Sequence, residues 1–482
     1  MTNAKQTTLI GLLWGSIERF SAQLVQFVVM IVMARLLSPH DYGVVGMLTI
    51  FIAISQTLVD SGFSQALIRK QNRTETDNST VFYFNIVVGV LIYLILFLCA
   101  PLIAHFYKEP ILIEVTRVLG IVVIANSLAV VQRALLSANI DFKTQAQATI
   151  GAAVLSGIVG ITMAANNFGI WAIVWQQTSN ACIVTLLLWI LCKWHPQLEY
   201  SWHAFKELFS FGSKLMLAGI INTVYNNIYL LVIGKVFSAQ DLGHYTRAHQ
   251  FAEFPSSNIT GIIQRVTYPT LCKIDNDRQL EYTYRKMLRL SAFFIFPLMI
   301  GLAAVANPFV ELILTEKWLP TAPLLTIICF SMMWYPIHAL NLNLLQVKGR
   351  SNLFLRLEII KKLIGVTILI ITIPLGLVWM CIGSIVSSII CLIVNTHYTG
   401  TLINVGFFVQ LRDLIPILCI SLAMGGIVYA SLHLCSTPVW QLIIGITIGV
   451  VVYIIEARLF CTQEYRTIKN IITTYHHARY GK

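Results

Sequence analysis

Three long stretches without charged residues constrain the fold of this chain more than any other feature. No Asp, Glu, Lys or Arg occurs in the 49 residues 144–192, the 49 residues 363–411 or the 42 residues 414–455. A membrane-spanning helix needs about 20 apolar residues, so each stretch has room for two helices and a short turn. Turn-forming residues lie near the middle of each stretch, which predicts three transmembrane hairpins with turns at 166–169, 374–376 and 436–438.

The composition extends this pattern to the whole chain. Only 11% of the 482 residues are charged and 57% are hydrophobic, whereas soluble domains carry about 25% charged residues. The first apolar stretch, residues 9–37, is longer than a signal-peptide core and is interpreted as a span. We expect an all-α polytopic membrane protein with about fourteen transmembrane helices, at 9–37, 43–66, 80–104, 112–134, 146–165, 169–192, 211–237, 243–269, 290–314, 321–345, 353–374, 377–400, 414–433 and 438–459. A break is expected in the second span at Asp60 and Gly62.

The basic charges indicate the orientation of these spans. The formal net charge is +12, and 26 of the 33 Lys and Arg residues fall in the loops and span ends on the side of both termini. Cytoplasmic loops are enriched in Lys and Arg, so both termini are predicted to be cytoplasmic. The excess of basic residues therefore indicates the orientation of the chain in the membrane, and no nucleic-acid partner is expected.

A short motif recurs at an offset of 200 residues. Residues 34–43 and 234–243 share a basic residue, two apolar residues and the pattern Ser-x-x-Asp-x-Gly, each at the end of the first span of a six-span block. We predict two pseudo-symmetric six-helix bundles, 1–200 and 201–412, followed by two extra transmembrane helices and a cytoplasmic tail, 413–482. Parallel repeats are typical of transporters that bind their substrate between the halves.

Polar residues within the spans are the candidate substrate contacts, because ionisable groups are costly in a bilayer. These polar residues concentrate in the first helices of each six-helix block. Their distribution predicts a hydrated, partly cationic cavity between the two blocks. Arg suits a phosphate ligand because its planar fork binds bidentately. The predicted substrate-binding residues are Arg19, Gln23, Gln26, Asn222, Asn226, Arg247, Gln250 and Glu253.

Structural roles for the same residues stay open. Arg19 can pair with Glu18 and Arg247 with Glu253, as buried salt bridges. The amide side chains can equally form interhelical hydrogen bonds. Two further ionisable residues within spans, Glu311 and His338, could relay protons, although each is isolated in the sequence.

Enzymatic chemistry is not expected from this sequence. The chain has no P-loop, and no segment is large enough for a soluble catalytic domain. Asp275-Asn276-Asp277 lies in a short loop, and His476-His477 is an adjacent pair in a polar tail. We therefore predict no catalytic residue, no metal and no cofactor. A membrane polymerase or glycosyltransferase is disfavoured, and a structural scaffold would leave the repeat and the arginines within spans unexplained.

Several blocks of sequence, in order over residues 1–365, resemble a known family. The blocks that carry the resemblance are Ala34–Gly43, Asp60–Phe63, Ala66–Ile68, Asp141–Lys143, Phe211–Lys214, Asp241–Tyr245, Phe254–Asn258, Glu316–Pro320 and Lys348–Arg350. In these blocks the chain is similar to the Wzx-like polysaccharide flippases of the multidrug/oligosaccharidyl-lipid/polysaccharide superfamily, and in particular to lipopolysaccharide and colanic-acid exporters of the WzxC type.

The resemblance implies a transporter of the bacterial inner membrane. Its expected substrate is undecaprenyl-diphosphate-linked oligosaccharide for surface polysaccharide or lipopolysaccharide biosynthesis, moved by alternating access, with the polysaccharide polymerase machinery as an expected partner. In relatives the basic lumen comes from the first two helices of each repeat, which selects Arg19 and Arg247 here. The alternative is a cation-coupled antiporter of drugs or small molecules from the same superfamily, which would need a lumen rich in acidic residues.

Overall fold

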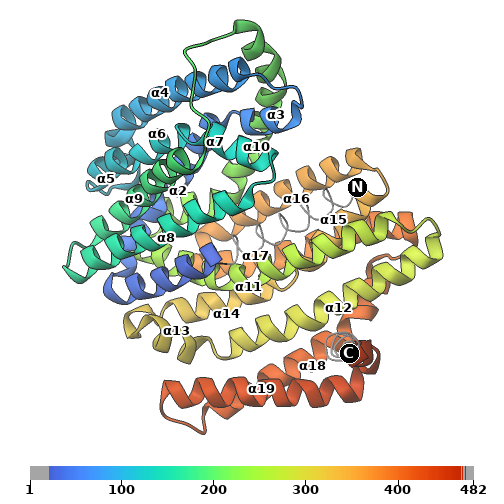
Figure 1. Cartoon of the computed structure of the whole chain (residues 1–482). Helices are drawn as coiled ribbons and strands as arrows, with labels where there is room; N and C mark the ends of the chain where they lie inside the picture. Colours follow the sequence, from blue (N-terminus) through green and yellow to red (C-terminus); the bar gives the residue numbers. More distant parts are fainter. Residues whose placement is uncertain (1–20, 468, 471–472, 474–482) are drawn as a thin grey trace, which may run out of the picture. The chain divides into compact units, whose positions relative to one another are not determined.

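The computed structural model describes residues 21–467, 469–470 and 473, and its secondary structure there is helical (Figure 1). The chain divides into two compact units, Met1–Gly243 and His244–Lys482. The predicted division at 1–200, 201–412 and 413–482 stays a prediction.

The first unit begins, in its described part, with a helix over Ser21–Leu36. The helices that follow are α2 (Pro39–Asp60), α3 (Phe63–Arg69), α4 (Glu75–Tyr107), α5 (Leu112–Leu119), α6 (Ile121–Ser127), α7 (Val130–Ala138), α8 (Phe142–Ala165), α9 (Ile170–Leu191) and α10 (Trp202–Val236). Helix α11 (Ala239–Cys272) starts at the end of this unit and continues into the second.

Local sequence explains where these helices start and break. Ser38 and Thr74 each form a capping box with the aspartate three residues later, so backbone N–H groups at the starts of α2 and α4 are hydrogen-bonded. Between α2 and α3, Ser61 and Gly62 adopt positive φ values of 45° and 70°, which ends one helix and starts the next. The break predicted at Asp60 and Gly62 is confirmed.

Side chains from distant parts of the first unit form its core. One cluster gathers Phe63 and Leu67 of α3, Phe82 of α4, Val131 of α7 and Leu208 of α10, all buried. Helix α10 also packs along α2, where the Thr57 and Thr223 hydroxyls lie 3.1 Å apart. The hairpin predicted at 146–192 is present as α8 and α9, which pack against each other.

The second unit contains most of α11 and the rest of the chain. Its further elements are α12 (Asp277–Ala304), α13 (Ala306–Leu314), η1 (Glu316–Trp318), α14 (Thr321–Met332), α15 (Tyr335–Val347), α16 (Ser351–Thr372), η2 (Ile373–Leu375), α17 (Leu377–Ile403), α18 (Phe407–Leu432) and α19 (Pro438–Phe460). The other two predicted hairpins are present as the packed pairs α16–α17 and α18–α19.

A buried polar network joins three helices of the second unit. The Gln410 amide of α18 donates to Asn341 Oδ1 of α15 at 2.9 Å and to Thr399 Oγ1 of α17 at 3.0 Å. All three side chains are at most 1% exposed. Buried polar groups need hydrogen-bond partners within the protein, and this network provides them between α15 and the consecutive helices α17 and α18.

The described helices confirm an all-helical, multi-pass membrane protein, and the expected number of about fourteen spans stays a prediction. Ten helices of the described part are long and apolar enough to cross a membrane, or eleven if α5–α7, bent by 41°, counts as one span. The sequence predicts about fourteen. The other three predicted spans are helical, but they do not meet these criteria: Ser21–Leu36 is short within the described residues, α11 is too polar, and α16 contains four charged residues.

Candidate functional site

The repeated Ser-x-x-Asp-x-Gly motif forms two matching helix starts in the first unit. The Asp41 carboxylate accepts from Ser38 N at 2.9 Å, and the Asp241 carboxylate accepts from Ser238 N at 3.2 Å. In return, each aspartate N–H donates to the serine Oγ, at 3.2 and 3.0 Å. The Ser-x-x-Asp part of the motif is thus an N-terminal cap on α2 and on α11.

The glycine of each motif lets the other copy approach. A Cβ built on Gly43 would lie 1.6 Å from the Ala239 carbonyl oxygen, and a Cβ on Gly243 would lie 1.9 Å from the Pro39 carbonyl oxygen. Adding 200 to Pro39 and Gly43 gives Ala239 and Gly243, so the two contacts are equivalent under the repeat. The motif therefore encodes a reciprocal backbone contact between the starts of α2 and α11.

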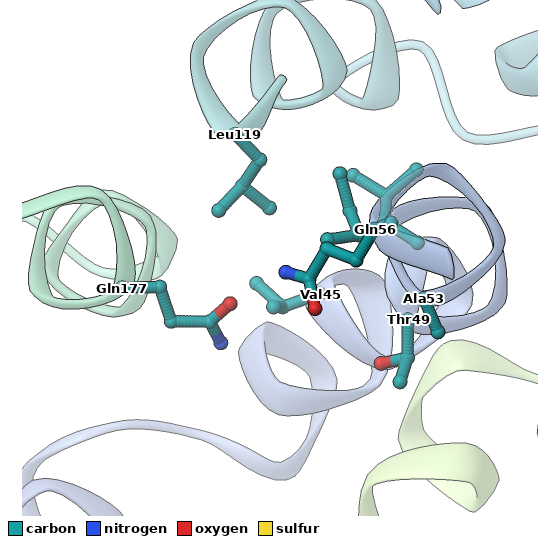
Figure 2. Close-up of a pocket in the computed structure, with 8 residues that line it drawn as sticks. Val45, Thr49, Ala53, Gln56, Leu119 and Gln177 are labelled. Atoms are coloured by element: carbon teal, nitrogen blue, oxygen red, sulfur yellow. The ribbon is translucent and has the colours of Figure 1, made fainter. Parts of the chain in front are cut away.

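A small cavity lies inside the first unit, between α2, α5 and α9. Its volume is about 240 Å³, and its polar lining comes from Thr49, Gln56 and Gln177. Figure 2 shows Gln56 and Gln177 reaching toward each other across it, with Leu119 on another side. Ligand sites usually measure ~300–1,000 Å³, so this cavity is too small to hold an oligosaccharide.

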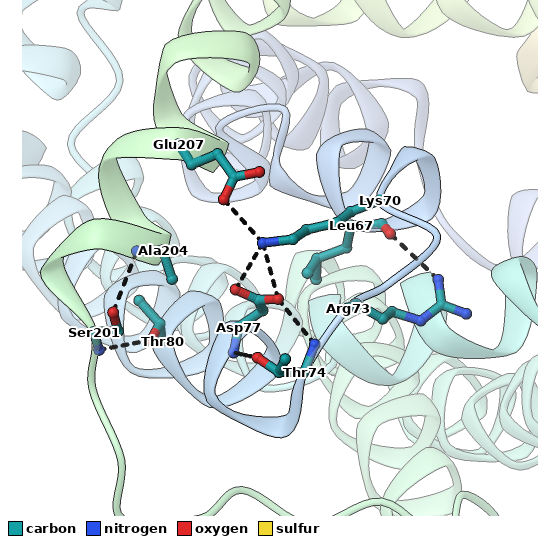
Figure 3. Close-up of polar contacts among 9 residues, drawn as sticks. All are labelled: Leu67, Lys70, Arg73, Thr74, Asp77, Thr80, Ser201, Ala204 and Glu207. Atoms are coloured by element: carbon teal, nitrogen blue, oxygen red, sulfur yellow. Dashed lines mark hydrogen bonds and ion pairs between the residues drawn. The ribbon is translucent and has the colours of Figure 1, made fainter.

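An ionic cluster joins the loop between α3 and α4 to the start of α10 (Figure 3). Lys70 Nζ lies 3.1 Å from Asp77 Oδ2 and 2.9 Å from Glu207 Oε2. Nearby, Ser201 N donates to Thr80 Oγ1 at 3.0 Å. Desolvation lowers the pKa of Lys70, but the hydrogen bonds to Glu207 and Asp77 outweigh it, so its pKa is raised. The cluster holds a loop and a helix start together as a fixed structural unit.

The predicted site residues of the first unit lie in different environments. Arg19 is outside the described residues. Gln23 is half-buried and Gln26 exposed on the helix over Ser21–Leu36. Asn222 and Asn226 are exposed on α10, one helical turn apart. The two amides of each pair therefore share a helix face at the expected spacing.

The predicted residues of the second unit form local contacts along α11. Arg247 is only 6% exposed, and its Nη1 donates to Gln250 Oε1 at 2.6 Å. Glu253 is exposed and pairs with His249, whose Nδ1 lies 3.4 Å from Glu253 Oε2. This arrangement brings Arg247 and Gln250 together, and it gives Glu253 a histidine partner that the sequence analysis did not select.

Charged residues on α16 were missed by the sequence analysis. Lys361 is half-buried and forms an ion pair with Glu358, one turn earlier on the helix. The carboxylates of Glu358 and of Glu253 both lie within electrostatic reach of Tyr335 on α15. The sequence contained a signal for these residues, because they lie within the predicted span 353–374 and ionisable groups within spans are candidate functional residues. These charges were assigned to the cytoplasmic end of the predicted span 353–374, so they were not selected as candidate site residues.

His338 of α15 is not isolated in the folded chain. Its Nε2 lies 3.0 Å from Ser388 Oγ, and its Nδ1 lies 3.1 Å from Asn395 Nδ2, both on α17. Lys361 is within electrostatic reach of the ring. The second unit thus gathers an ammonium and two carboxylates around neutral polar groups of α15 and α17, while the Arg247 guanidinium of α11 lies against Gln250. Such a mixture can contact both phosphate and sugar hydroxyl groups.

Comparison with known proteins adds a family and a fold to this geometry. A family model described as "Polysaccharide biosynthesis protein" matches residues 32–323. The chain is 27% identical over 357 residues to the teichuronic acid biosynthesis protein TuaB of Bacillus subtilis (strain 168), covering 73% of this chain and 74% of TuaB. It is 24% identical over 396 residues to the lipopolysaccharide biosynthesis protein WzxC of Escherichia coli (strain K12), covering 81% and 80%.

A solved structure shares the fold at low sequence identity. The lipid II flippase MurJ, in an inward closed conformation, superposes with a TM-score of 0.75 and 16% identity, covering 94% of this chain and 99% of that one. The helical arrangement is therefore that of a known membrane transporter.

Proposed function

The chain belongs to the polysaccharide biosynthesis family of Wzx-type flippases, which are membrane transporters and not enzymes, and we propose that it translocates undecaprenyl-diphosphate-linked oligosaccharide across the bacterial inner membrane. The finished glycan serves surface polysaccharide or lipopolysaccharide biosynthesis. Transport proceeds by alternating access of two six-span blocks within a fourteen-span chain, with both termini in the cytoplasm.

The observation that carries this proposal is the buried Arg247 in a chain of this family. Arg247 on α11 is 6% exposed, and burying a charge in a membrane protein is costly enough to mark a candidate functional site. A diphosphate offers several acceptor oxygens to a planar guanidinium fork. Arg247 and Lys361, together with Arg19, are the proposed phosphate contacts.

The amide side chains suit the sugar portion of the same substrate. Amides donate and accept hydrogen bonds and carry no charge, which fits neutral hydroxyl groups. Carboxylates accept hydrogen bonds from the same hydroxyls. The proposed sugar contacts are Gln23, Gln26, Asn222, Asn226, Gln250 and Glu253.

The membrane potential can drive such a substrate outward. With the inside negative, 100 mV favours outward movement of each negative charge by ~2.3 kcal/mol. A diphosphate carries more than one such charge, so an antiported ion is not required by this energetics.

The experiment is a flipping assay in proteoliposomes with fluorescent lipid-linked oligosaccharide, with and without an imposed potential. Arg247→Ala is expected to slow flipping at least tenfold, and Arg247→Lys to recover part of the rate because the positive charge is kept. Lys361→Ala is expected to slow flipping as well. Lys273→Ala is the matched control, since it removes an exposed cation that follows α11 and should leave the rate unchanged.

Two results would contradict the proposal. Full activity of the Arg247→Ala protein would remove this residue from the transport path. Exchange of cationic drugs against protons or Na⁺, without any lipid-linked sugar flipping, would favour the antiporter alternative.

A further inference from the structure

A second polar pocket lies in the second unit, between α12, the first turns of α18 and the end of α19. It measures about 430 Å³ and receives residues from α12, from the start of α18 and from the segment after α19. Helices α12 and α18 pack against each other, and so do α18 and α19. The lining includes three arginines and two carboxylates, namely Arg285, Arg289, Arg412, Asp413 and Glu464.

Among these three arginines, Arg285 forms the most hydrogen bonds with the described residues. Arg285 binds Asp413 through two parallel bonds, Nε to Oδ2 at 2.7 Å and Nη2 to Oδ1 at 2.8 Å. Its Nη1 also lies 3.6 Å from Glu281, one turn away on α12. This bidentate pair is the strong geometry for a guanidinium and a carboxylate, and it occupies the Asp413 carboxylate.

The other two arginines carry donors without acceptors. Arg289 Nε lies 3.2 Å from Glu464 Oε1, but this ion pair is not aligned as a hydrogen bond, and the Nε atom is buried. Arg412 lines the pocket and forms no ion pair or hydrogen bond with any residue that the structure describes. Each guanidinium has five N–H donors. Arg289 Nε is buried without a hydrogen-bond acceptor, whereas Arg412 is exposed and its donors are open to an external acceptor.

Apart from Glu456 of α19, the segments that follow Asp413 and Glu464 in the sequence carry no acidic side chain. After Glu464 the sequence contains no Asp or Glu, whereas it contains Arg466, Lys469, Arg479 and Lys482. The stretch 414–455 is also free of acidic residues. We therefore look for an acceptor for Arg289 and Arg412 outside the polypeptide.

The position of the pocket identifies the source of that acceptor. The apolar run of α12 begins after Arg289, that of α18 begins after Asp413, and α19 ends at Phe460. In the predicted topology, all three points lie at the cytoplasmic edge of the hydrocarbon layer. Ile417 and Pro416 line the pocket on its apolar side, and Phe460, 70% exposed, lines it as well. Lipid phosphates lie at this depth, and basic pockets between spans bind such head groups.

We propose that this pocket binds the phosphate head group of an anionic phospholipid, held by Arg289 and Arg412. The site is separate from the proposed contacts of the transported glycan lipid. The phosphate oxygens accept from both guanidinium groups, while the acyl chains extend past Phe460 along α19. The lipid thereby supplies acceptors to the two arginines that the described residues leave incompletely hydrogen-bonded.

The test measures lipids bound to the full-length protein by native mass spectrometry, after reconstitution in phosphatidylcholine with or without phosphatidylglycerol. The wild-type protein is expected to retain phosphatidylglycerol in preference to phosphatidylcholine. Arg412→Gln, and Arg289→Gln with Arg412→Gln, should weaken retention about tenfold or more. Arg412 has no protein partner in the described part of the chain, so its replacement should not disturb folding. Arg458→Gln is the matched control, an exposed arginine in the last turn of α19 that does not line the pocket.

Each outcome decides the proposal. Loss of phosphatidylglycerol in the pocket variants, with normal retention in the Arg458→Gln protein, supports it. Equal retention in all variants overturns it. If inorganic phosphate at millimolar concentration displaces phosphatidylglycerol completely, the site is a free-phosphate site and the lipid assignment is wrong. Flipping activity is not used as a readout, so failure of the glycan-lipid proposal would leave this result interpretable.

Discussion

Replacing Gly43 with alanine tests the reciprocal contact between the two repeat motifs. The new Cβ would lie 1.6 Å from the backbone carbonyl oxygen of Ala239, and a backbone atom cannot turn away as a side chain can. The starts of α2 and α11 would have to separate by roughly 1.5–2 Å to reach ordinary van der Waals distance. Such overpacking costs about 1–3 kcal/mol. Gly243→Ala should cost about the same, because its Cβ meets the Pro39 carbonyl oxygen at 1.9 Å.

Thermal unfolding of the detergent-solubilised protein, followed by tryptophan fluorescence, provides the measurement. Gly261→Ala is the matched control, since a Cβ added at this position of α11 would meet nothing within 4 Å and the variant should gain up to about 1 kcal/mol from helix propensity. The Gly43→Ala and Gly243→Ala double variant should cost less than the sum of the two, because the first Cβ already separates the helices. A melting temperature for Gly43→Ala equal to that of Gly261→Ala would refute the reasoning.

Two further predictions concern the ends of the second unit's helices. Asp413→Asn should destabilise the protein by about 2 kcal/mol, because it removes the partner of Arg285. The cost is below the ~3–5 kcal/mol of a fully buried pair, since the Arg285 side chain is 31% exposed. In the same unfolding assay, Asp275→Asn in an exposed loop should have no measurable effect on stability. Burial raises the pKa of the Cys461 thiol to about 11, so its reactive thiolate is scarce at pH 8 and increases as pH rises toward 11. In maleimide labelling at pH 8, exposed Cys272 should react and Cys461 should not; rapid labelling of Cys461 would contradict this environment.

Much of the fold could be predicted because membrane insertion depends on contiguous sequence. The hairpins at 144–192, 363–411 and 414–455 follow from runs too apolar for water, and the structure has a helix pair at each. The break at Gly62 follows from local backbone preference. The count of spans was less predictable, because α11 and α16 combine helical length with polar or charged residues.

The candidate site was only partly predictable, because contacts between side chains depend on how the helices pack and not on contiguous sequence. The sequence shows that position 247 carries a charge. It does not show which of several polar neighbours Arg247 binds, because side-chain packing determines that Gln250, one turn away, is the partner. Lys361 and Glu358 were visible as charges within a predicted span, yet their proximity to α15 depends on how α16 packs. Arg19 lies outside the described residues, and its role stays a prediction.

The sequence by itself determined a helical chain that crosses the membrane many times, because backbone groups in hydrocarbon must be satisfied within each helix and apolar length can be counted residue by residue. Local sequence also determines the starts of α2, α4 and α11, since the Ser and Thr caps there act over three residues. Only the tertiary structure decided that Gly43 meets Ala239 and that Arg285 pairs with Asp413, 128 residues away. Such contacts depend on how helices pack, and no local pattern specifies which distant helix becomes the neighbour.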